Sequence, residues 1–181
     1  MMDKKLTLAD EVLVFRCQLG DESAFERLVA QYDGKIRYFV RRLVGQVPGE
    51  DDILQNTWLA VWTQLPRLRH AESFRTWLYR IARNIALQSV RGRSLDVPLE
   101  DNYPAPTGDE GSFQPEEAAA VHVALNEISS AHKEVLVLRF LEGLSYEEIA
   151  EVVGCSVGTV RSRIYYGKSS LRQYMETRKN E

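Results

Sequence analysis

Apolar and polar positions along the chain repeat every three to four residues, which is the spacing of amphipathic α-helices. No stretch of useful length alternates with the two-residue period of a strand. Before residue 94 the pattern predicts four helices, at about 8–19, from 21 or 23 to the break at Pro48 and Gly49, at 50–65 and at 73–91. Their inward stripes are expected to hold most of the large side chains, among them Leu28, Tyr32, Ile36, Phe39, Trp58, Val61, Trp62, Phe74, Trp77 and Leu78.

The later part of the chain repeats this pattern with shorter helices. Pro115 is placed to begin a helix that runs to about residue 128. A second helix is expected at 131–141 and is ended by Gly143, and a closely spaced pair follows between Leu144 and Arg172. The pattern therefore predicts an all-α fold.

A segment of different composition separates the two groups of helices. Residues 94–117 contain four of the six prolines and seven acidic residues, with no lysine or arginine. Such composition is typical of a flexible linker. The sequence therefore predicts two small helical domains, 1–93 and 118–181, joined by an acidic linker at 94–117.

Charge is distributed unevenly along a chain whose net charge is −3 at pH 7. The segment 94–117 carries −7, residues 1–93 carry +4, and residues 118–181 are balanced. Because local charge governs binding to nucleic acid more than the total does, the acidic average does not exclude a DNA-binding protein.

Several classes of protein are disfavoured by what the chain lacks. No apolar run approaches the roughly 20 residues of a membrane span, and the first residues lack the apolar core of a signal peptide, so we expect a cytoplasmic protein without membrane insertion. Cys17 and Cys155 form no CxxC pair, and the histidines show no metal-binding spacing. We therefore expect no metal site, no cofactor and no enzymatic activity, with both cysteines acting as small buried apolar residues.

The pair of helices after residue 144 has the signature of a helix-turn-helix. Ser145 and Glu148 can form a capping box, and Gly154 lies where the chain must turn sharply. Val160 and Ile164 would hold the second helix on the core. The residues left to face outward, where they can meet the major groove, are Arg161, Ser162, Arg163, Tyr165 and Lys168. A helical hairpin with a solvated basic face remains the alternative.

The N-terminal part carries two further polar surfaces. Asp52, Gln55 and Asn56 fall on one face of the helix at 50–65, opposite its apolar stripe, although simple solvation also explains such a face. Cations then gather around a loop and an aromatic-rich helix, a combination that suits single-stranded nucleic acid unless the aromatics are plain core. This basic group comprises Arg67, Arg69, His70, Arg75, Arg80, Arg83, Asn84 and Arg91.

Two blocks of the chain resemble the extracytoplasmic-function sigma factors of bacterial RNA polymerase. DDILQNTWLAVWTQL followed by FRTWLYRIARNIA is similar to their region 2, and LSYEEIAEVVGCSVGTVRSRI is similar to their region 4. The resemblance covers about residues 10–93 and 118–175. It implies a promoter-specificity factor that binds core RNA polymerase through the β′ clamp helices and the β flap, and promoter DNA at the −10 and −35 elements.

The resemblance also implies roles for particular residues. The helix facing the clamp would present Asp52, Gln55, Asn56 and Leu59. The −10 element would be met by a base-capture loop, 67–73, and the helix after it, through Arg67, Arg69, His70, Ser73, Arg80, Arg83 and Asn84. The −35 element would be met by Arg139, Ser156, Thr159, Arg161, Ser162, Arg163, Tyr165 and Lys168.

The chain departs from the family pattern at three places. Asn56 stands where an acidic residue is usual, and Leu68 stands where an aromatic residue is common. Tyr166 and Gly167 replace the more usual basic residue and alanine in the recognition helix. The first departure affects one contact with the clamp, and the second affects stacking of a base in the loop. The third affects sequence preference at the −35 element.

Two other classes of protein stay open at this point. One is a stand-alone helix-turn-helix regulator whose N-terminal helices sense a ligand or dimerise. The other is an interaction protein that has lost DNA binding. Relatives in the resembled family are commonly held by an anti-sigma factor, which makes such a protein a further candidate partner.

Overall fold

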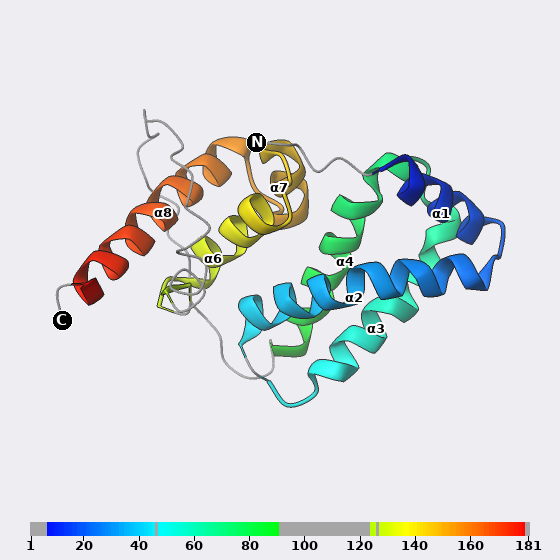
Figure 1. Cartoon of the computed structure of the whole chain (residues 1–181), viewed down its shortest axis with the longest axis horizontal. Coiled ribbons are helices and arrows are strands. Elements are labelled where there is room, and N and C mark those ends of the chain that lie inside the picture. Colours follow the sequence, from blue (N-terminus) through cyan, green and yellow to red (C-terminus); the bar gives the residue numbers. More distant parts are fainter. Residues whose placement is uncertain (1–6, 46, 91–123, 126, 180–181) are drawn as a thin grey trace.

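The computed structural model describes residues 7–45, 47–90, 124–125 and 127–179, and within these ranges it contains helices and no strand (Figure 1). The predicted all-α fold is confirmed. The predicted linker at 94–117 and most of the helix expected at 115–128 lie outside the described residues. The elements, in order, are α1 (Leu8–Gln18), α2 (Glu22–Val44), α3 (Glu50–Gln64), the short 3₁₀ helices η1 (Leu65–Arg67) and η2 (Ala71–Ser73), α4 (Phe74–Val90), α6 (Ser130–Leu136), the π-helical turn η5 (Val137–Leu141), α7 (Tyr146–Val153) and α8 (Val157–Lys179).

Local caps fix where the helices of the N-terminal half begin. Thr7 and Asp10 form a reciprocal capping box at the start of α1, in which each side chain accepts a hydrogen bond from the backbone N–H of the other residue. The carboxylate of Asp21 accepts from the N–H of Ala24 at the start of α2. Before α3, Gly49 has a φ of 90°, which only glycine adopts without strain. The predicted helices of this half are thus confirmed to within a few residues at each end.

Aromatic side chains of α2 and α4 build the core of the N-terminal half. Tyr32 meets Phe74 edge to face with 5.6 Å between ring centroids, and Phe39 meets Tyr79 in the same way at 5.3 Å. All four rings are buried. The predicted inward stripes of these two helices therefore meet one another.

The two tryptophans of α3 differ in exposure. Trp58 is buried, and its indole Nε1 donates a hydrogen bond of 2.9 Å to the carboxylate of Asp33. The expectation that Trp62 is buried as well is wrong, because 37% of this residue is exposed. The ring of Phe25 contacts that of Trp62, with 4.7 Å between the ring centroids.

Caps also define the two helices α7 and α8. Ser145 and Glu148 form the expected capping box, and α7 ends at Gly154, whose φ of 75° is in the left-handed region. The hydroxyl of Ser156 accepts from the N–H of Thr159 at the start of α8. The predicted helix-turn-helix is therefore present in the structure.

Gly167 allows α6 and α8 to approach closely. A Cβ atom at this position would lie 3.0 Å from Cδ1 of Leu136 and 3.1 Å from Cβ of His132. Glycine inside a helix costs about 1 kcal/mol relative to alanine. The close crossing of the two helices gives a structural reason for the departure at this position.

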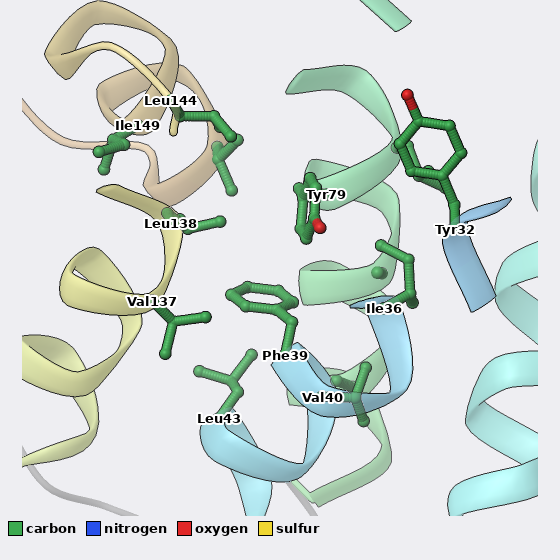
Figure 2. Packing of buried hydrophobic residues seen from close by; sticks show 14 of the residues in the cluster. Tyr32, Ile36, Phe39, Val40, Leu43, Tyr79, Val137, Leu138, Leu144 and Ile149 are labelled. Atoms are coloured by element: carbon green, nitrogen blue, oxygen red, sulfur yellow. The ribbon is translucent and has the colours of Figure 1, made fainter. Parts of the chain in front are cut away.

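The N-terminal and C-terminal halves pack against each other through an apolar boundary. Figure 2 shows Phe39 and Leu43 of α2 and Tyr79 of α4 facing Val137 and Leu138 of η5. These side chains belong to a buried cluster that runs through both halves. The two groups of helices are therefore in direct contact in this structure (Figure 1).

Candidate polymerase and nucleic-acid interfaces

One face of α3 carries the four residues expected to meet the clamp. Asp52, Gln55, Asn56 and Leu59 are all exposed, and 62% of Leu59 is accessible to solvent. Their spacing of three, one and three residues places them on the same side of a helix. The structure therefore brings together the set that the sequence predicted.

A cleft of about 340 Å³ lies beside this face, and sequence reasoning missed it. Asp52 and Asn56 line one wall, while Ile85, Gln88 and Val90 of α4 contribute to another. The two walls come from helices that are far apart in the chain, so no local pattern indicates the cleft.

The loop between η1 and η2 exposes the expected basic residues. Arg67, Arg69 and His70 are accessible to solvent. Ser73 is half-buried, and its hydroxyl donates to the carbonyl of His70 at 2.7 Å. Ala71 is buried and anchors the loop to the core. Three cationic or ionisable side chains are thereby presented on one ordered loop.

Gln18 of α1 holds this loop in place. Its side-chain amide donates to the carbonyl oxygens of Leu65 at 3.2 Å and Leu68 at 2.7 Å. This positioning role was missed, because it joins residues about 50 positions apart. No signal in the local sequence marks Gln18.

The basic side chains of α4 face the C-terminal half in this structure. Nη1 of Arg80 lies 2.9 Å from Oε1 of Glu151, and Nε of Arg83 lies 2.5 Å from Oε1 of Glu134. Asn84 is exposed. Of the three α4 residues expected at the −10 element, two are therefore paired with carboxylates of the same chain.

Exposure along the recognition helix α8 varies from residue to residue. Ser156, Arg161 and Tyr165 are exposed. Ser162 is half-buried, and its hydroxyl donates to the carbonyl of Gly158 at 3.2 Å. The outward side of α8 therefore carries an arginine, a tyrosine and a serine.

Thr159 and Lys168 are partly enclosed by neighbouring side chains. The hydroxyls of Thr159 and Ser156 lie 3.0 Å apart. Nζ of Lys168 stands 5.5 Å from the centre of the Phe140 ring. Both residues are half-buried, so each presents only part of its side chain to solvent.

The expectation that Arg163 faces outward is wrong. Arg163 is only 7% exposed. Burial raises the pKa of the Glu134 carboxyl, and Arg83 and Arg163 oppose that shift through their positive charge. The buried carboxylate explains how an arginine is accommodated on the inner side of α8.

Tyr146 brings two arginines of the predicted −35 set together. The guanidinium carbon of Arg139 lies 5.1 Å from the centre of the Tyr146 ring, and that of Arg161 lies 6.0 Å from it. Arg139 also donates from Nη1 to the carbonyl of Leu144 at 2.9 Å. Arg139 therefore supports the start of the helix-turn-helix, a role that sequence reasoning missed.

Two further features of the described residues concern metal ions and membranes. Among them, no three His, Cys, Asp or Glu side chains converge as ligands for a metal ion. None of their helices has both the length and the apolar character needed to cross a bilayer.

Two family models match the chain in succession. The model described as Sigma-70 region 2 matches residues 28–95, and the model described as Sigma-70, region 4 matches residues 118–171. The first contains the α3 face, the basic loop and α4, and the second contains the helix-turn-helix.

Curated relatives are similar over nearly the whole length. The RNA polymerase sigma-H factor of Pseudomonas aeruginosa is 34% identical over 92% of this chain and 94% of its own. The ECF RNA polymerase sigma-E factor of Escherichia coli strain K12 is 37% identical over 91% of this chain and 93% of its own.

Solved structures share the arrangement of helices. The structure of CnrH in complex with the cytosolic domain of CnrY is similar over 93% of this chain and 98% of that chain, with a TM-score of 0.68 and 27% identity. The sigma factor RpoE in complex with the anti-sigma factor NepR from Bartonella quintana shares the fold, with a TM-score of 0.64 and 24% identity over 84% and 96% of the two chains.

Proposed function

The chain belongs to the extracytoplasmic-function (ECF) sigma factors, and we propose from this premise that it directs core RNA polymerase to specific promoters and assists their opening. One observation carries the proposal: matches to regions 2 and 4 occur in that order in a chain that covers more than nine-tenths of two sigma factors. A stand-alone regulator is not favoured, since these full-length relatives are polymerase factors.

We infer that the two halves divide this work. Residues 1–93 would bind core polymerase and the −10 element, residues 118–181 would bind the −35 element and the β flap, and 94–117 would connect them. The role asks for binding only, so the chain itself needs no catalytic group. We also propose that it acts in the cytoplasm, where core polymerase is found.

The exposed face of α3 is the proposed docking surface for the β′ clamp helices. Asp52, Gln55 and Asn56 offer hydrogen-bonding groups, and Leu59 offers an exposed apolar side chain beside them. A polar face with one apolar anchor suits a protein interface. Their common orientation on one helix supports the proposal.

The proposed −10 surface combines the basic loop with α4. Arg67, Arg69, His70 and Ser73 would meet the opened strand at the loop, and Arg80, Arg83 and Asn84 would meet it along α4. Exposure of the loop supports the first part of this surface. Its α4 part requires that Arg80 and Arg83 leave their glutamate partners.

The proposed −35 surface is the outward side of α8 with its supporting residues. Arg161 is the principal candidate for a base contact, because arginine matches the acceptors of guanine in the major groove. Its other members would be Arg139, Ser156, Thr159, Ser162, Tyr165 and Lys168. Arg163 is left out, because it is buried.

An anti-sigma factor is the proposed regulatory partner. RpoE from Bartonella quintana, a sigma factor of the same fold, is in complex with one. The wild-type chain should therefore lose activity when its anti-sigma factor is added to a transcription assay.

Transcription in vitro tests the main proposal. The chain is mixed with core polymerase and a library of promoter sequences, and the start sites of the transcripts are read. We expect initiation at a family of sites that share a −35 and a −10 element. Absence of sigma-dependent initiation at every promoter would contradict the proposal.

A double substitution tests the α3 surface. Asp52→Ala with Gln55→Ala should weaken binding to core polymerase about tenfold or more while leaving the fold intact, because two exposed interface groups are lost. The measurement is a titration of labelled core polymerase, with circular dichroism as a check on folding. Glu26→Ala with Gln173→Ala, which removes an exposed carboxylate and an exposed amide elsewhere, is the matched control. Equal affinity for both double variants would refute the assignment.

A further inference from the structure

The segment between α3 and α4 is anchored to the core by three apolar side chains. Leu65 and Ala71 are buried, and Leu68 is half-buried and packs against the same apolar cluster. The basic and ionisable residues between these anchors are exposed, namely Arg67, Arg69 and His70. The conformation of the backbone between the anchors therefore determines where the three exposed side chains lie.

Backbone hydrogen bonds shape the two ends of this segment, and a side chain from α1 shapes its middle. The N–H of Leu68 donates to the carbonyl of Leu65 at 3.0 Å, and the N–H of Ser73 donates to the carbonyl of His70 at 3.1 Å. Between these bonds, the carbonyl of Leu68 accepts from the side-chain amide of Gln18 at 2.7 Å. The same amide donates to the carbonyl of Leu65 at 3.2 Å. Gln18 thus ties the end of α3 to the middle of the loop.

The helix that carries Gln18 is itself held against α2. Val14 and Cys17 on its inner side are buried, and so is Asp10. The carboxylate of Asp10 accepts a hydrogen bond of 2.6 Å from the side-chain amide of Gln31 on α2. Because α1 is fixed in this way, Gln18 gives the loop a fixed point of attachment.

Leu68 increases the importance of this attachment. An aromatic ring at this place could stack on an unstacked base, whereas Leu68 packs its side chain against the core. Recognition of a base would then depend on the backbone groups and the exposed side chains of the loop. Hydrogen bonds to a base require donors and acceptors at set distances and angles, so a loop without a fixed backbone would discriminate poorly between bases.

Gln18 also lies outside the segment that the region 2 family model matches. That match covers residues 28–95, which include the loop, whereas α1 ends at Gln18. The support for the loop therefore comes from a helix that precedes the matched residues.

We propose that Gln18 is a positioning residue for capture of a −10 base. By holding the carbonyls of Leu65 and Leu68, it keeps the loop 67–73 in the conformation that receives the base. This inference rests on the proposed function. Gln18 acts through the backbone of the loop, so selectivity between bases at the captured position depends on α1, whereas attraction to phosphate depends on the cations of the loop.

Three variants separate this role from a general effect on stability. Gln18→Met removes the amide donors and keeps an unbranched side chain of similar length. Gln18→Glu keeps the shape of the side chain and replaces the donating amide by an acceptor. Gln31→Met is the matched control, because it makes the same change at an amide that joins α2 to α1. Circular dichroism and thermal unfolding establish that each variant is folded.

Binding of single strands to the holoenzyme measures the selectivity. The probes are labelled non-template strands with the −10 sequence of a promoter that the wild-type holoenzyme uses, together with strands in which each base is replaced in turn. The ratio of Kd for the replaced and the original base at the captured position should fall about fivefold in both Gln18 variants, because the loop is no longer preorganised. The ratio should stay at the wild-type value in Gln31→Met. A loss of stability alone would weaken binding of all strands equally and leave the ratio unchanged.

Hydrogen exchange of the free chain measures the hold on the loop without DNA or polymerase. Peptides that cover residues 65–73 should exchange about fivefold faster in Gln18→Met than in Gln31→Met, because loss of the two hydrogen bonds favours local opening of the loop. Peptides from α2 and α4 should exchange at equal rates in the two variants.

The two proposals fail in different ways. If the wild-type holoenzyme initiates normally and both Gln18 variants keep the base selectivity of Gln31→Met, the positioning role is overturned and the proposed function stands. If the wild-type chain supports no initiation with core polymerase, the proposed function and the role in base capture are overturned together. Hydrogen exchange then decides by itself whether Gln18 holds the loop.

Discussion

The two basic surfaces of the molecule differ in what their arginines meet. On α4, Arg80 and Arg83 are held by glutamates from the other half, whereas Arg161 on α8 is exposed to solvent and borders an aromatic ring. Both surfaces are candidates for contact with promoter DNA. Arginines on α4 thus bind carboxylates of the same chain, whereas the arginine on α8 is accessible to solvent.

The two surfaces therefore differ in whether their arginine side chains are accessible to DNA, and not in the type of residue they carry. The α8 surface is accessible in the free protein, so its affinity for DNA should depend on its own side chains. Access to α4 depends on the contact between the halves. Substitutions that act on one surface should therefore leave the other unchanged.

Phe39→Ala is expected to have the largest effect, since it removes a buried ring from the boundary between the halves. Truncation of a buried phenylalanine costs about 3–5 kcal/mol. The free energy of unfolding, measured by urea denaturation, should fall by that amount. Phe15→Ala on α1 is the control, because this ring is 55% exposed. A comparable loss for both would show that Phe39 does not support the boundary.

Arg161→Ala tests the accessible surface. Loss of a base contact should weaken binding of a −35 duplex by about 1–3 kcal/mol and relax the choice of base at one position. Fluorescence anisotropy with duplexes substituted at each position gives both quantities. Arg172→Ala, further along the exposed side of α8, should weaken binding less. A loss that is equal for all sequences would make Arg161 a phosphate contact.

Ser145→Ala should have a smaller effect, confined to the stability of the helix-turn-helix. The substitution removes the hydrogen bond to the N–H of Glu148 and half of the capping box, which costs about 1 kcal/mol. Thermal unfolding provides the measurement. Ser169→Ala, in the middle of α8, is expected to leave stability nearly unchanged.

Acid should affect the cap of α2 least of all, and only at low pH. Hydrogen bonds from Ser23, Arg16 and the N–H of Ala24 lower the pKa of Asp21 to about 2. Because the folded pKa lies below the ordinary value of 3.8, this stabilisation is present above pH 4 and is lost as the pH falls toward 2.

Asp21→Asn keeps a good capping side chain and removes its titration. The melting temperature of this variant should therefore decline less than that of the wild type between pH 4 and pH 2. Parallel declines would mean that Asp21 gains nothing from its charge in the folded protein.

Much of the local structure could be predicted, because it depends on residues close in the chain. The capping box of Ser145 and Glu148 and the turn at Gly154 follow from short-range hydrogen bonds and backbone preference. The exposed face of α3 follows from helical spacing alone. The full set Asp52, Gln55, Asn56 and Leu59 was therefore found on one face.

Contacts between distant segments could not be predicted from local patterns. Arg163 lies three residues after the buried Val160, so its position suits the inner side of α8, but a charged side chain there needs a partner. The buried carboxyl of Glu134, whose pKa the positive charge of Arg163 lowers, comes from another helix. The pairing of Arg83 with Glu134 and the hold of Gln18 on the basic loop are long-range in the same way.

The two cysteines, Cys17 and Cys155, lie in different halves of the molecule and differ in how readily a thiol reagent can reach them. Cys17 is buried in the N-terminal half, where burial raises its thiol pKa to about 11, and Cys155 is half-buried at the turn between α7 and α8. Thiolate is the reactive form, so Cys17 should react with a thiol reagent only during rare opening of its half. The rate of alkylation at Cys17, resolved from that at Cys155 by mass spectrometry, would then time the opening of the N-terminal half in the unlabelled native chain.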